Sequence, residues 1–293
     1  MIITNNLVKT FGKFRALDDI SINVLDNDVY GFLGHNGAGK STTIEILAGL
    51  SKPNEGEVKI NSEMIGYLPE EPKFYPWMTG AEYLTYIGSE YKGDTKKRVK
   101  EMLEWVGLEK AAKRRIGGYS RGMRQRLGMA VALIHDPDLV LLDEPSSALD
   151  PEGRSDVLRM IKELKSRGKT IFLSTHILDD VEKVCDKVGI IREGKMIKEA
   201  DLSTIMNQYT EPNFEINFAE VPDPYEIIEI NKEQWVKDIT KDEKKITLIT
   251  ADGANMSNEI YGIVSKLMTP VDSIVRKKHT LEEIYMMITD GEE

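Results

Sequence analysis

The sequence of 293 residues contains a single cysteine, Cys185, and no long apolar run. One cysteine excludes both an intrachain disulfide and a zinc site built from cysteines. No segment approaches the ~20 consecutive apolar residues that a transmembrane helix needs, so we expect the chain not to cross a membrane unaided. The N-terminus has neither a basic stretch nor a sustained apolar segment, which predicts that there is no signal peptide.

An excess of positive charge is also missing. Lys and Arg number 39 against 49 Asp and Glu, giving a net charge of −10. This balance argues against the broad basic surface that sequence-independent nucleic-acid binding uses, so we expect no nucleic-acid partner. The acidity is concentrated at one end, because residues 211–293 carry 9 Lys/Arg and 18 Asp/Glu, or −9 of the total.

Short apolar runs alternate with helical patterns over residues 1–210, which predicts an α/β fold. Strands are expected at 21–25, 29–33, 139–142 and 170–174, with a hairpin at 190–197 that turns at Glu193-Gly194-Lys195. Helices are expected around 40–50, 79–91, 94–106, 119–135 and 152–167.

A small second domain is predicted after Thr210-Glu211-Pro212-Asn213. Beyond this point the patterns indicate strands at 214–218, 245–250 and 271–276, helices at 224–230 and 258–268, and an amphipathic ending at 280–287. The predicted domains are therefore residues 1–210 and an accessory α+β domain at 211–293.

The segment Gly34-His35-Asn36-Gly37-Ala38-Gly39-Lys40-Ser41 matches the phosphate-binding loop G-x-x-x-x-G-K-[ST] in full. Small residues let successive backbone N–H groups turn inward around a phosphate, and the following helix adds the positive end of its dipole. Lys40 supplies charge for the β- and γ-phosphate oxygens, while the Ser41 hydroxyl can ligate Mg²⁺. A strand before the loop and a helix after it favour this interpretation over a simple glycine-rich turn.

Two carboxylates end a predicted buried strand in Leu139-Val140-Leu141-Leu142-Asp143-Glu144. In that position Asp143 can hold Mg²⁺, and Glu144 can polarise an attacking water. An apolar run that ends in Asp-Glu is weak evidence alone. Together with the loop at Gly34 it predicts a nucleoside triphosphate site.

Pro145-Ser146-Ser147-Ala148-Leu149-Asp150-Pro151 follows directly, and Ser174-Thr175-His176 comes later. In their order and spacing, these motifs resemble the nucleotide-binding subunit of ABC transporters over residues 1 to about 210. The resemblance implies a P-loop cassette with a mixed sheet, a helical subdomain at about 72–135, and hydrolysis of ATP with Mg²⁺. It also implies a head-to-tail homodimer, in which each ATP lies between the phosphate loop of one copy and the signature helix of the other.

The resemblance also implies roles for individual residues. Glu144 matches the catalytic carboxylate, His176 the histidine that contacts the γ-phosphate and holds the attacking water, and Lys40 the phosphate-loop lysine. Phe11 stands where the family has an aromatic residue that stacks on adenine, although a strand end would equally place a core aromatic there. Asp150 matches a loop that signals across the dimer, but it could also serve as a helix cap. The implied nucleotide contacts are Phe11, Asn36, Gly37, Ala38, Gly39, Lys40, Ser41, Thr42, Ser120, Gly122 and Asp150, and the implied Mg²⁺ ligands are Ser41, Glu70 and Asp143.

The sequence departs from the family pattern in two places. Its signature reads Tyr119-Ser120-Arg121-Gly122-Met123 instead of Leu-Ser-Gly-Gly-Gln, so the Arg121 side chain must point away from the nucleotide or add positive charge to it. Ser120 can still cap the helix, and Gly122 still allows close backbone approach. Glu70 replaces a glutamine that links Mg²⁺ to the docking site of the membrane partner. A carboxylate can coordinate Mg²⁺ there, or it could be a surface acid in a Pro-flanked loop.

Other nucleotide-hydrolysing classes fit less well. The Asn-Lys-x-Asp motif of a GTPase is absent, and Lys40 and Asp143 are only 103 positions apart, too close for the long coiled coil of a chromosome-organising ATPase. A ribosome-acting ABC protein would normally have two cassettes and a basic linker. A soluble ABC-type ATPase that acts on a protein or nucleic-acid complex stays open as an alternative, as does a degenerate nucleotide-binding scaffold, against which the set Lys40, Asp143, Glu144 and His176 argues.

We expect the chain to power transport through a separately encoded integral membrane permease. The signature, the stretch Leu68-Pro69-Glu70-Glu71-Pro72 and the ending Thr280 to Tyr285 resemble prokaryotic drug-exporter ATPases, so export is the favoured direction. The expected location is cytoplasmic, peripheral on the inner face of the cell membrane. Phe74, Tyr75, Trp77 and Met78 could line a groove for a permease helix or form the packed face of the helical subdomain. The C-terminal domain is expected either to contact its dimer mate or to cap the cassette.

Overall fold

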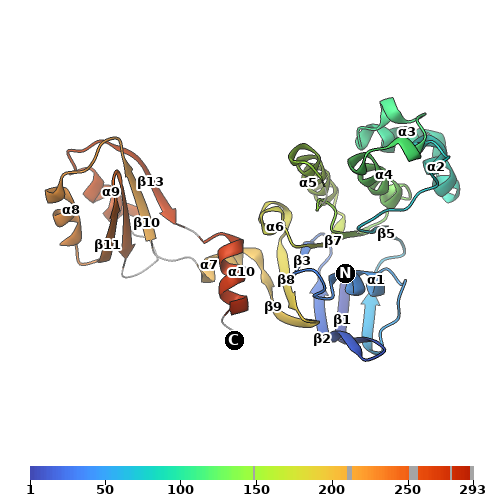
Figure 1. The fold of residues 1–293 in the computed structure, drawn as a ribbon, viewed down its shortest axis with the longest axis horizontal. Coiled ribbons are helices and arrows are strands. Elements are labelled where there is room, and N and C mark those ends of the chain that lie inside the picture. The colour runs from blue at the N-terminus through green and yellow to red at the C-terminus, as the bar shows by residue number, and fades with distance from the viewer. Residues whose placement is uncertain (148, 210–212, 251–256, 278, 291–293) are drawn as a thin grey trace. The chain divides into compact units, whose positions relative to one another are not determined.

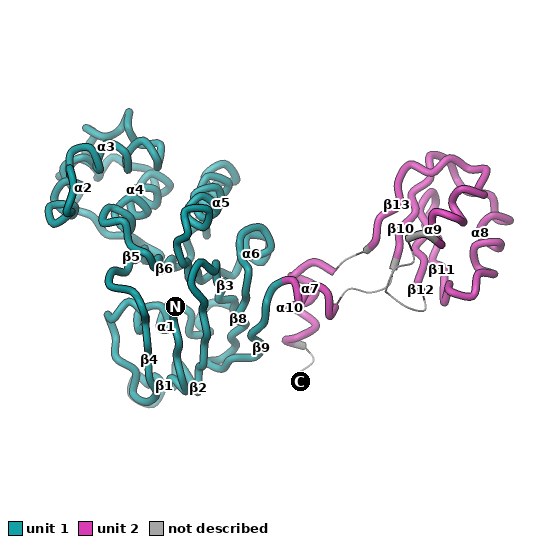
Figure 2. The backbone as a smooth tube through the Cα atoms, turned by 180° about the vertical axis from the view of Figure 1, so that it is seen from behind, with its two compact units in different colours: residues 1–202 teal, residues 203–293 magenta. Residues whose placement is uncertain are grey.

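The computed structural model describes residues 1–147, 149–209, 213–250, 257–277 and 279–290. Contacts between Cα atoms divide the chain into two compact units, residues 1–202 and 203–293 (Figure 2), and each unit has its own hydrophobic core. The assignment of residues 1–210 and 211–293 as functional domains stays a prediction. Within the described residues, no helix combines the length and the apolar character needed to span a bilayer.

A six-stranded sheet in the order β5-β6-β7-β3-β8-β9 forms the centre of the first unit (Figure 1). Five strands run parallel, and β9 pairs antiparallel with β8. β3, β6 and β7 are buried along their whole length, which explains why their sequences are continuous apolar runs. The strands are β3 (Val29–Leu33), β5 (Ile65–Leu68), β6 (Leu139–Asp143), β7 (Thr170–Thr175), β8 (Lys187–Arg192) and β9 (Lys195–Asp201).

A smaller antiparallel sheet in the order β2-β1-β4 contributes to the same core. Its strands are β1 (Ile2–Phe11), β2 (Phe14–Val24) and β4 (Glu55–Ile60). The main core combines side chains from β1 and β2, from the central strands and from α1 (Lys40–Leu47). Within it the rings of Tyr30 and Phe172 stack with their centroids 5.2 Å apart. The mixed-sheet α/β fold class predicted from the sequence is confirmed.

Three helices, α2 (Gly80–Ile87), α3 (Thr95–Trp105) and α4 (Arg121–Leu133), pack on one another, and α4 also contacts β5 (Figure 1). They are accompanied by the short 3₁₀ helices η1 (Gly88–Glu90), η2 (Glu109–Ala111) and η3 (Ile116–Gly118). Two further helices, α5 (Pro151–Ser166) and α6 (Leu178–Val184), contact each other. The sequence does not predict α6, because seven residues are too few to display a helical period.

The second unit begins in α7 (Leu202–Gln208) and continues as strand, helix, two strands, helix and strand. Its sheet has the order β11-β12-β10-β13 and is antiparallel throughout, which is the ferredoxin-like arrangement. The α+β organisation predicted for this part of the chain is therefore confirmed, while its accessory role stays a prediction. The elements are β10 (Asn213–Phe218), α8 (Pro224–Asn231), β11 (Val236–Asp242), β12 (Lys245–Thr250), α9 (Ser257–Val264), β13 (Val271–Lys277) and α10 (Leu281–Asp290).

β11 is a strand that the sequence does not predict. It lies at the edge of the sheet, and only Val236 and Ile239 along it are half-buried. An edge strand needs few apolar side chains and benefits from charged ones that oppose further pairing. The alternation that identifies a half-buried strand is therefore too weak to see in Val236–Asp242.

Glu226 in α8 is a buried carboxylate that joins this helix to the segment before β13. It accepts hydrogen bonds from the backbone N–H groups of Met268 (2.5 Å) and Thr269 (3.0 Å) and from the Thr269 hydroxyl. Burial acts to raise the pKa of Glu226, but these bonds and one from the Asp223 N–H outweigh it, so its pKa lies below the ordinary value. The ionised carboxylate therefore stabilises the second unit.

We expect the substitution Glu226→Gln to lower the free energy of unfolding of the β10–β13 sheet by about 1–3 kcal/mol near neutral pH, because a charged acceptor of several hydrogen bonds is lost. A carboxyl whose pKa is depressed by folding contributes stability above its unfolded pKa, and this contribution is lost as the pH falls through the folded value. The difference between variant and parent should accordingly shrink in acid.

Amide hydrogen exchange in β10, β12 and β13 of the full chain measures this difference. Glu229→Gln is the matched control, because Glu229 lies on the same helix but is half-exposed and pairs with Lys232 at the surface. A Glu226→Gln effect that is no larger than the control, or that persists unchanged in acid, would contradict the prediction.

Candidate nucleotide site

The phosphate-loop sequence connects the end of β3 to the start of α1. Gly37 and Gly39 have φ of +84° and +111°, a region that favours glycine. A Cβ on Gly39 would lie 2.7 Å from a Leu17 methyl, and one on Gly34 would lie 2.5 Å from the Ile191 carbonyl oxygen. The glycines therefore let the loop turn tightly against β2 and β8. Gly39 is the N-cap of α1 and offers no side-chain cap, so the backbone N–H groups of this helix end face the loop.

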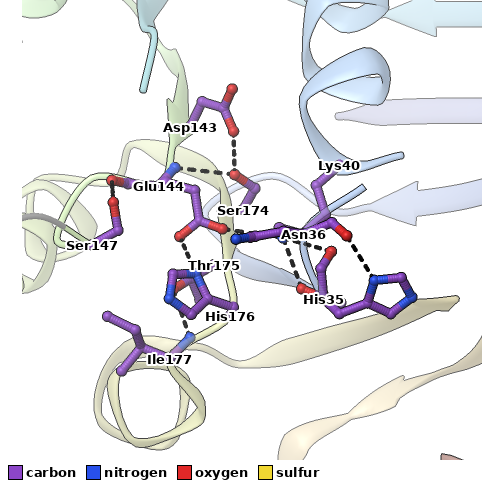
Figure 3. A network of polar contacts seen from close by, with 11 residues as sticks. His35, Asn36, Lys40, Asp143, Glu144, Ser147, Ser174, Thr175, His176 and Ile177 are labelled. Atoms are coloured by element: carbon purple, nitrogen blue, oxygen red, sulfur yellow. Dashed lines mark hydrogen bonds and ion pairs between the residues drawn. The ribbon is translucent and has the colours of Figure 1, made fainter. Parts of the chain in front are cut away.

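Lys40 is buried at the first position of α1, with 6% of its side chain exposed. Its Nζ donates to the carbonyl oxygens of Gly34 at 2.7 Å and His35 at 3.2 Å. The same Nζ lies 3.1 Å from Glu144 Oε1, and the Glu144 side chain is only 5% exposed (Figure 3). The phosphate-loop lysine therefore forms an ion pair with the predicted catalytic carboxylate.

Asp143 and Glu144 come from the end of β6, beside the end of β7. Ser174 on β7 donates its hydroxyl to Asp143 Oδ1 at 2.5 Å and accepts the Glu144 N–H at 3.1 Å (Figure 3). Burial raises the pKa of the Asp143 carboxyl, while hydrogen bonds from Ser174 and Ser41 act in the opposite direction. Glu144 has φ of +47°, a left-handed conformation that is costly for a residue with a Cβ.

His176 directly follows β7, and its side chain is 44% exposed. Its Nδ1 lies 2.9 Å from Glu144 Oε2 (Figure 3). One carboxylate therefore contacts Lys40 through one oxygen and His176 through the other. This contact follows from the sheet order, because β6 and β7 are adjacent parallel strands in which Asp143 is paired with Ser174.

A cavity of about 360 Å³ opens over the phosphate loop. Phe14 lines it, whereas Phe11, the predicted adenine contact, does not belong to its lining. The two phenylalanines face each other across the β1–β2 hairpin, and Lys9 Nζ lies 5.2 Å from the centre of the Phe11 ring. The predicted role of Phe11 stays a prediction, and Phe14 is a second candidate that the symmetric Phe-Gly-Lys-Phe hairpin could have suggested. Ala38, also in the loop, is fully buried and does not line the cavity, which is lined by Phe14, Ala16, Asn36, Gly37, Gly39, Lys40, Ser41, Thr42, Glu70 and Glu144.

Three other predicted contacts lie together in a separate cavity of about 400 Å³. Ser120 caps α4 by accepting the Met123 N–H at 3.2 Å, and Asp150 caps α5 by accepting the Gly153 N–H at 2.9 Å. Gly122, in the first turn of α4, lines the same cavity. No residue of the phosphate loop lines the cavity that contains Ser120, Gly122 and Asp150. One copy therefore presents the predicted site as two separate halves.

The two departures from the family pattern meet in a third cavity, of about 260 Å³. Glu70 lines it together with Arg121, and Glu70 also lines the cavity over the phosphate loop. Gln125 lies here as well, 6% exposed, and its Nε2 has no hydrogen-bond partner among the residues that the structure describes. Glu70 thus stands between the phosphate loop and the signature helix, which its position in the sequence does not reveal.

The oxygen atoms around the phosphate loop fit a magnesium ion better than a metal held by protein alone. In the described part of the chain, no group of three or more His, Cys, Asp or Glu side chains could hold a metal ion. Mg²⁺ typically takes one or two carboxylates and completes its coordination with substrate phosphates and water. The Asp143 carboxylate and the Ser41 hydroxyl, which hydrogen-bond to each other, supply oxygens of this kind.

These features define a class of protein. A phosphate loop between a strand and a helix, followed by an Asp-Glu pair at the end of a second parallel strand of the same sheet, is the site of a P-loop nucleoside triphosphatase. The model of the ABC transporter family matches residues 17–147. With this match and the relatives described next, the chain belongs to the ABC transporter ATP-binding proteins, and it is an ATPase of that family.

Two bacterial relatives extend the similarity well beyond the matched segment. The ABC transporter ATP-binding protein YxlF of Bacillus subtilis is 44% identical over 229 residues, which cover 75% of this chain and 77% of that protein. The bacitracin transport ATP-binding protein BcrA of Bacillus licheniformis is 45% identical over 212 residues, covering 68% and 69%.

A solved structure shows the same fold. The ATP-binding cassette MJ0796, in a dimeric post-hydrolysis state bound to ADP and Pi, is 26% identical with a TM-score of 0.64, and the match covers 69% of this chain and 99% of that one. The family and fold expected from the sequence motifs are confirmed. The alternative of a soluble ATPase that acts on a protein or nucleic-acid complex is not favoured.

Proposed function

We propose that two copies of this chain bind ATP head to tail and hydrolyse it at two composite sites. The observation that carries the proposal is the separation of the predicted contacts into two cavities of one copy, one over the phosphate loop and one at Ser120, Gly122 and Asp150. A second copy in the opposite orientation would bring these two halves together. The dimeric state of the similar cassette MJ0796 supports the arrangement.

Within each site, Glu144 is proposed to polarise the attacking water. Its carboxylate is buried, and one of its oxygens lies 2.9 Å from His176 Nδ1. Lys40 contacts the other oxygen at 3.1 Å. When Lys40 turns to the β- and γ-phosphates, it leaves that oxygen free to accept a hydrogen bond from the water.

Ser41 and Asp143 are proposed to hold Mg²⁺, with Glu70, which lines the same cavity as Ser41, as a further ligand. The ion would neutralise charge on the β- and γ-phosphate oxygens. Ser174 keeps the Asp143 carboxylate in place through its hydroxyl. The contacts of Phe11, Asn36, Gly37, Ala38, Gly39 and Thr42 with ATP belong to the same proposal.

We further propose that the dimer powers export through a separately encoded permease and is located in the cytoplasm, on the inner face of the membrane. The bacitracin transport named for the relative BcrA supports a role in transport, and the export direction follows from the resemblance of the sequence motifs to drug-exporter ATPases. An exposed aromatic pair supports docking, because Tyr75 and Trp77 stack with centroids 5.0 Å apart while 47% and 65% exposed. Phe74 packs edge-on against Tyr83 of α2. The aromatic segment therefore has both a packed side and an exposed side.

Residues 1–210 would form the ATPase domain and 211–293 an accessory domain.

Co-expression with the product of a neighbouring gene that encodes several apolar spans of ~20 residues tests the permease partner. The two proteins should co-purify in detergent, and Trp77→Asp should reduce recovery of the partner at least ~10-fold, because a charge replaces an aromatic anchor. Tyr261→Asp is the matched control, since Tyr261 is a 63% exposed aromatic on α9. Equal recovery with parent and Trp77→Asp would contradict this docking surface, and a partner that does not co-purify at all would contradict the permease.

A further inference from the structure

Asp180 in α6 is a buried carboxylate outside the cavities described above. Only 2% of its side chain is exposed, and both of its oxygens are engaged. The Ser146 hydroxyl donates to Oδ2 at 2.5 Å, and Arg154 Nε donates to Oδ1 at 2.5 Å. A carboxylate removed from water is stabilised only when such partners compensate it, so these contacts fix the positions of all three residues.

The partners of Asp180 hold both ends of one loop. Ser146 is 3% exposed and follows Glu144 by two positions. Arg154 lies in the first turns of α5, where its N–H donates to the carbonyl oxygen of Asp150 at 2.9 Å. Ser146 and Arg154 therefore anchor the chain just after Glu144 and just after Asp150.

Asp180 is also connected to the turn that carries His176. It lies four positions after His176, and its N–H donates to the carbonyl oxygen of Ile177 at 3.2 Å. The Ile177 N–H in turn donates to the Thr175 hydroxyl at 3.0 Å (Figure 3). One side chain thus links the loop that begins at Glu144 to the turn that carries His176.

This loop needs support from outside itself. Glu144 has a left-handed backbone, with φ of +47°, and a strained conformation persists only when its surroundings impose it. The distance of 2.9 Å between Glu144 Oε2 and His176 Nδ1 depends on two separate loops keeping their relative position. The Glu144 N–H donates to Ser174 on β7, and Asp180 supports the loop on the side of α6.

We propose that Asp180 is a positioning residue for ATP hydrolysis. It touches neither nucleotide nor water, and it acts through Ser146 and Arg154 to keep Glu144, Asp150 and His176 in one fixed arrangement. The inference rests on the proposed role of Glu144. Because no hydrogen bond or ion pair joins Asp180, Ser146 or Arg154 to the phosphate loop or to Lys40 among the described residues, substitution of Asp180 should affect turnover without affecting nucleotide affinity.

The substitution Asp180→Asn tests this role, because asparagine has nearly the same shape but lacks the charge that holds Arg154. We expect kcat to fall ~10–100-fold while KM and the affinity for a fluorescent ATP analogue stay within about twofold, because small misplacements of a reacting group affect the chemical step most. Ser146→Ala should lower kcat in the same way. In the double variant kcat should be close to that of Asp180→Asn alone, since both act through one contact.

Asp179→Asn is the matched control. Asp179 pairs with the same Arg154, at 2.8 Å, but it is 60% exposed, so its substitution should leave kcat unchanged. The inference is overturned if Asp179→Asn lowers kcat as much as Asp180→Asn does, if Asp180→Asn weakens nucleotide affinity as much as turnover, or if it changes neither.

Two further measurements separate the possible failures. If Asp180→Asn does not fold, Ser146→Ala decides alone, because it removes one hydrogen bond and leaves the ion pair with Arg154 in place. Full turnover in Glu144→Gln would defeat the proposed role of Glu144, on which the inference rests. A collapse of turnover in Glu144→Gln, together with normal kcat in Asp180→Asn and Ser146→Ala, would overturn only the role of Asp180.

Discussion

Replacing Glu144 with glutamine is expected to reduce ATP turnover by ~10²–10⁴-fold, the range that a positioned general base contributes. Glutamine keeps the shape of the side chain and can still contact His176, but it cannot accept a proton from the attacking water. Because glutamine is neutral, it also ceases to hold Lys40 by charge, so ATP should bind at least as tightly as before. Long-lived dimers with bound ATP should therefore accumulate.

Steady-state phosphate release, measured beside the affinity for ATP, checks this expectation. Glu101→Gln is a suitable control, because Glu101 lies on α3 and is half-exposed among surface lysine and arginine pairs. A variant that lost affinity and turnover together would indicate that Glu144 mainly holds Lys40 in place. Unchanged turnover would show that another group activates the water.

The second large effect is expected at Ser120. In the Glu144→Gln background, Ser120→Arg should weaken ATP-dependent dimerisation at least ~100-fold, because its long side chain would fill the cavity that Ser120 shares with Gly122 and Asp150. Ser120 is also the N-cap of α4, so the same change removes a cap that contributes about 1 kcal/mol. A second substitution is needed to separate the two effects.

Ser120→Asp makes this separation. Aspartate is as good an N-cap as serine, but its charge would repel a γ-phosphate, so this variant too should stay monomeric in ATP. Ser89→Arg, at an exposed serine of η1, is the control and should dimerise normally. Sedimentation velocity with and without ATP distinguishes the outcomes. If Ser120→Arg dimerised like the parent, the signature would have to lie elsewhere in the sequence.

The sequence was sufficient to locate those parts of the site that are contiguous in the chain. A phosphate loop requires its glycines, lysine and serine within eight positions, and the Asp143-Glu144 pair needs only a buried strand before it. The buried strands β3, β6 and β7 could also be predicted, because each is a short, continuous apolar run of the kind that forms a fully buried strand. These elements fix the fold class and the family.

Contacts between distant segments could not be predicted in this way. The pair Lys40–Glu144 and the hydrogen bond between Ser174 and Asp143 depend on which strands are neighbours, and strand order is not a local property. The meeting of Glu70 with Arg121 depends in the same way on how α4 packs against β5. β11 stayed hidden for a different reason, since an edge strand needs so few apolar side chains.

The ion pair between Lys40 and Glu144 has a consequence for how the cycle ends. In the proposed mechanism, a phosphate that binds Lys40 displaces Glu144, so the carboxylate would compete with nucleotide for the lysine. The binding free energy of the nucleotide is reduced by the free energy of the Lys40–Glu144 ion pair. This pair re-forms when the phosphate leaves Lys40. A side chain that promotes hydrolysis would thus also help to expel the product. The lifetime of bound ADP, and not only the rate of cleavage, should respond to Glu144.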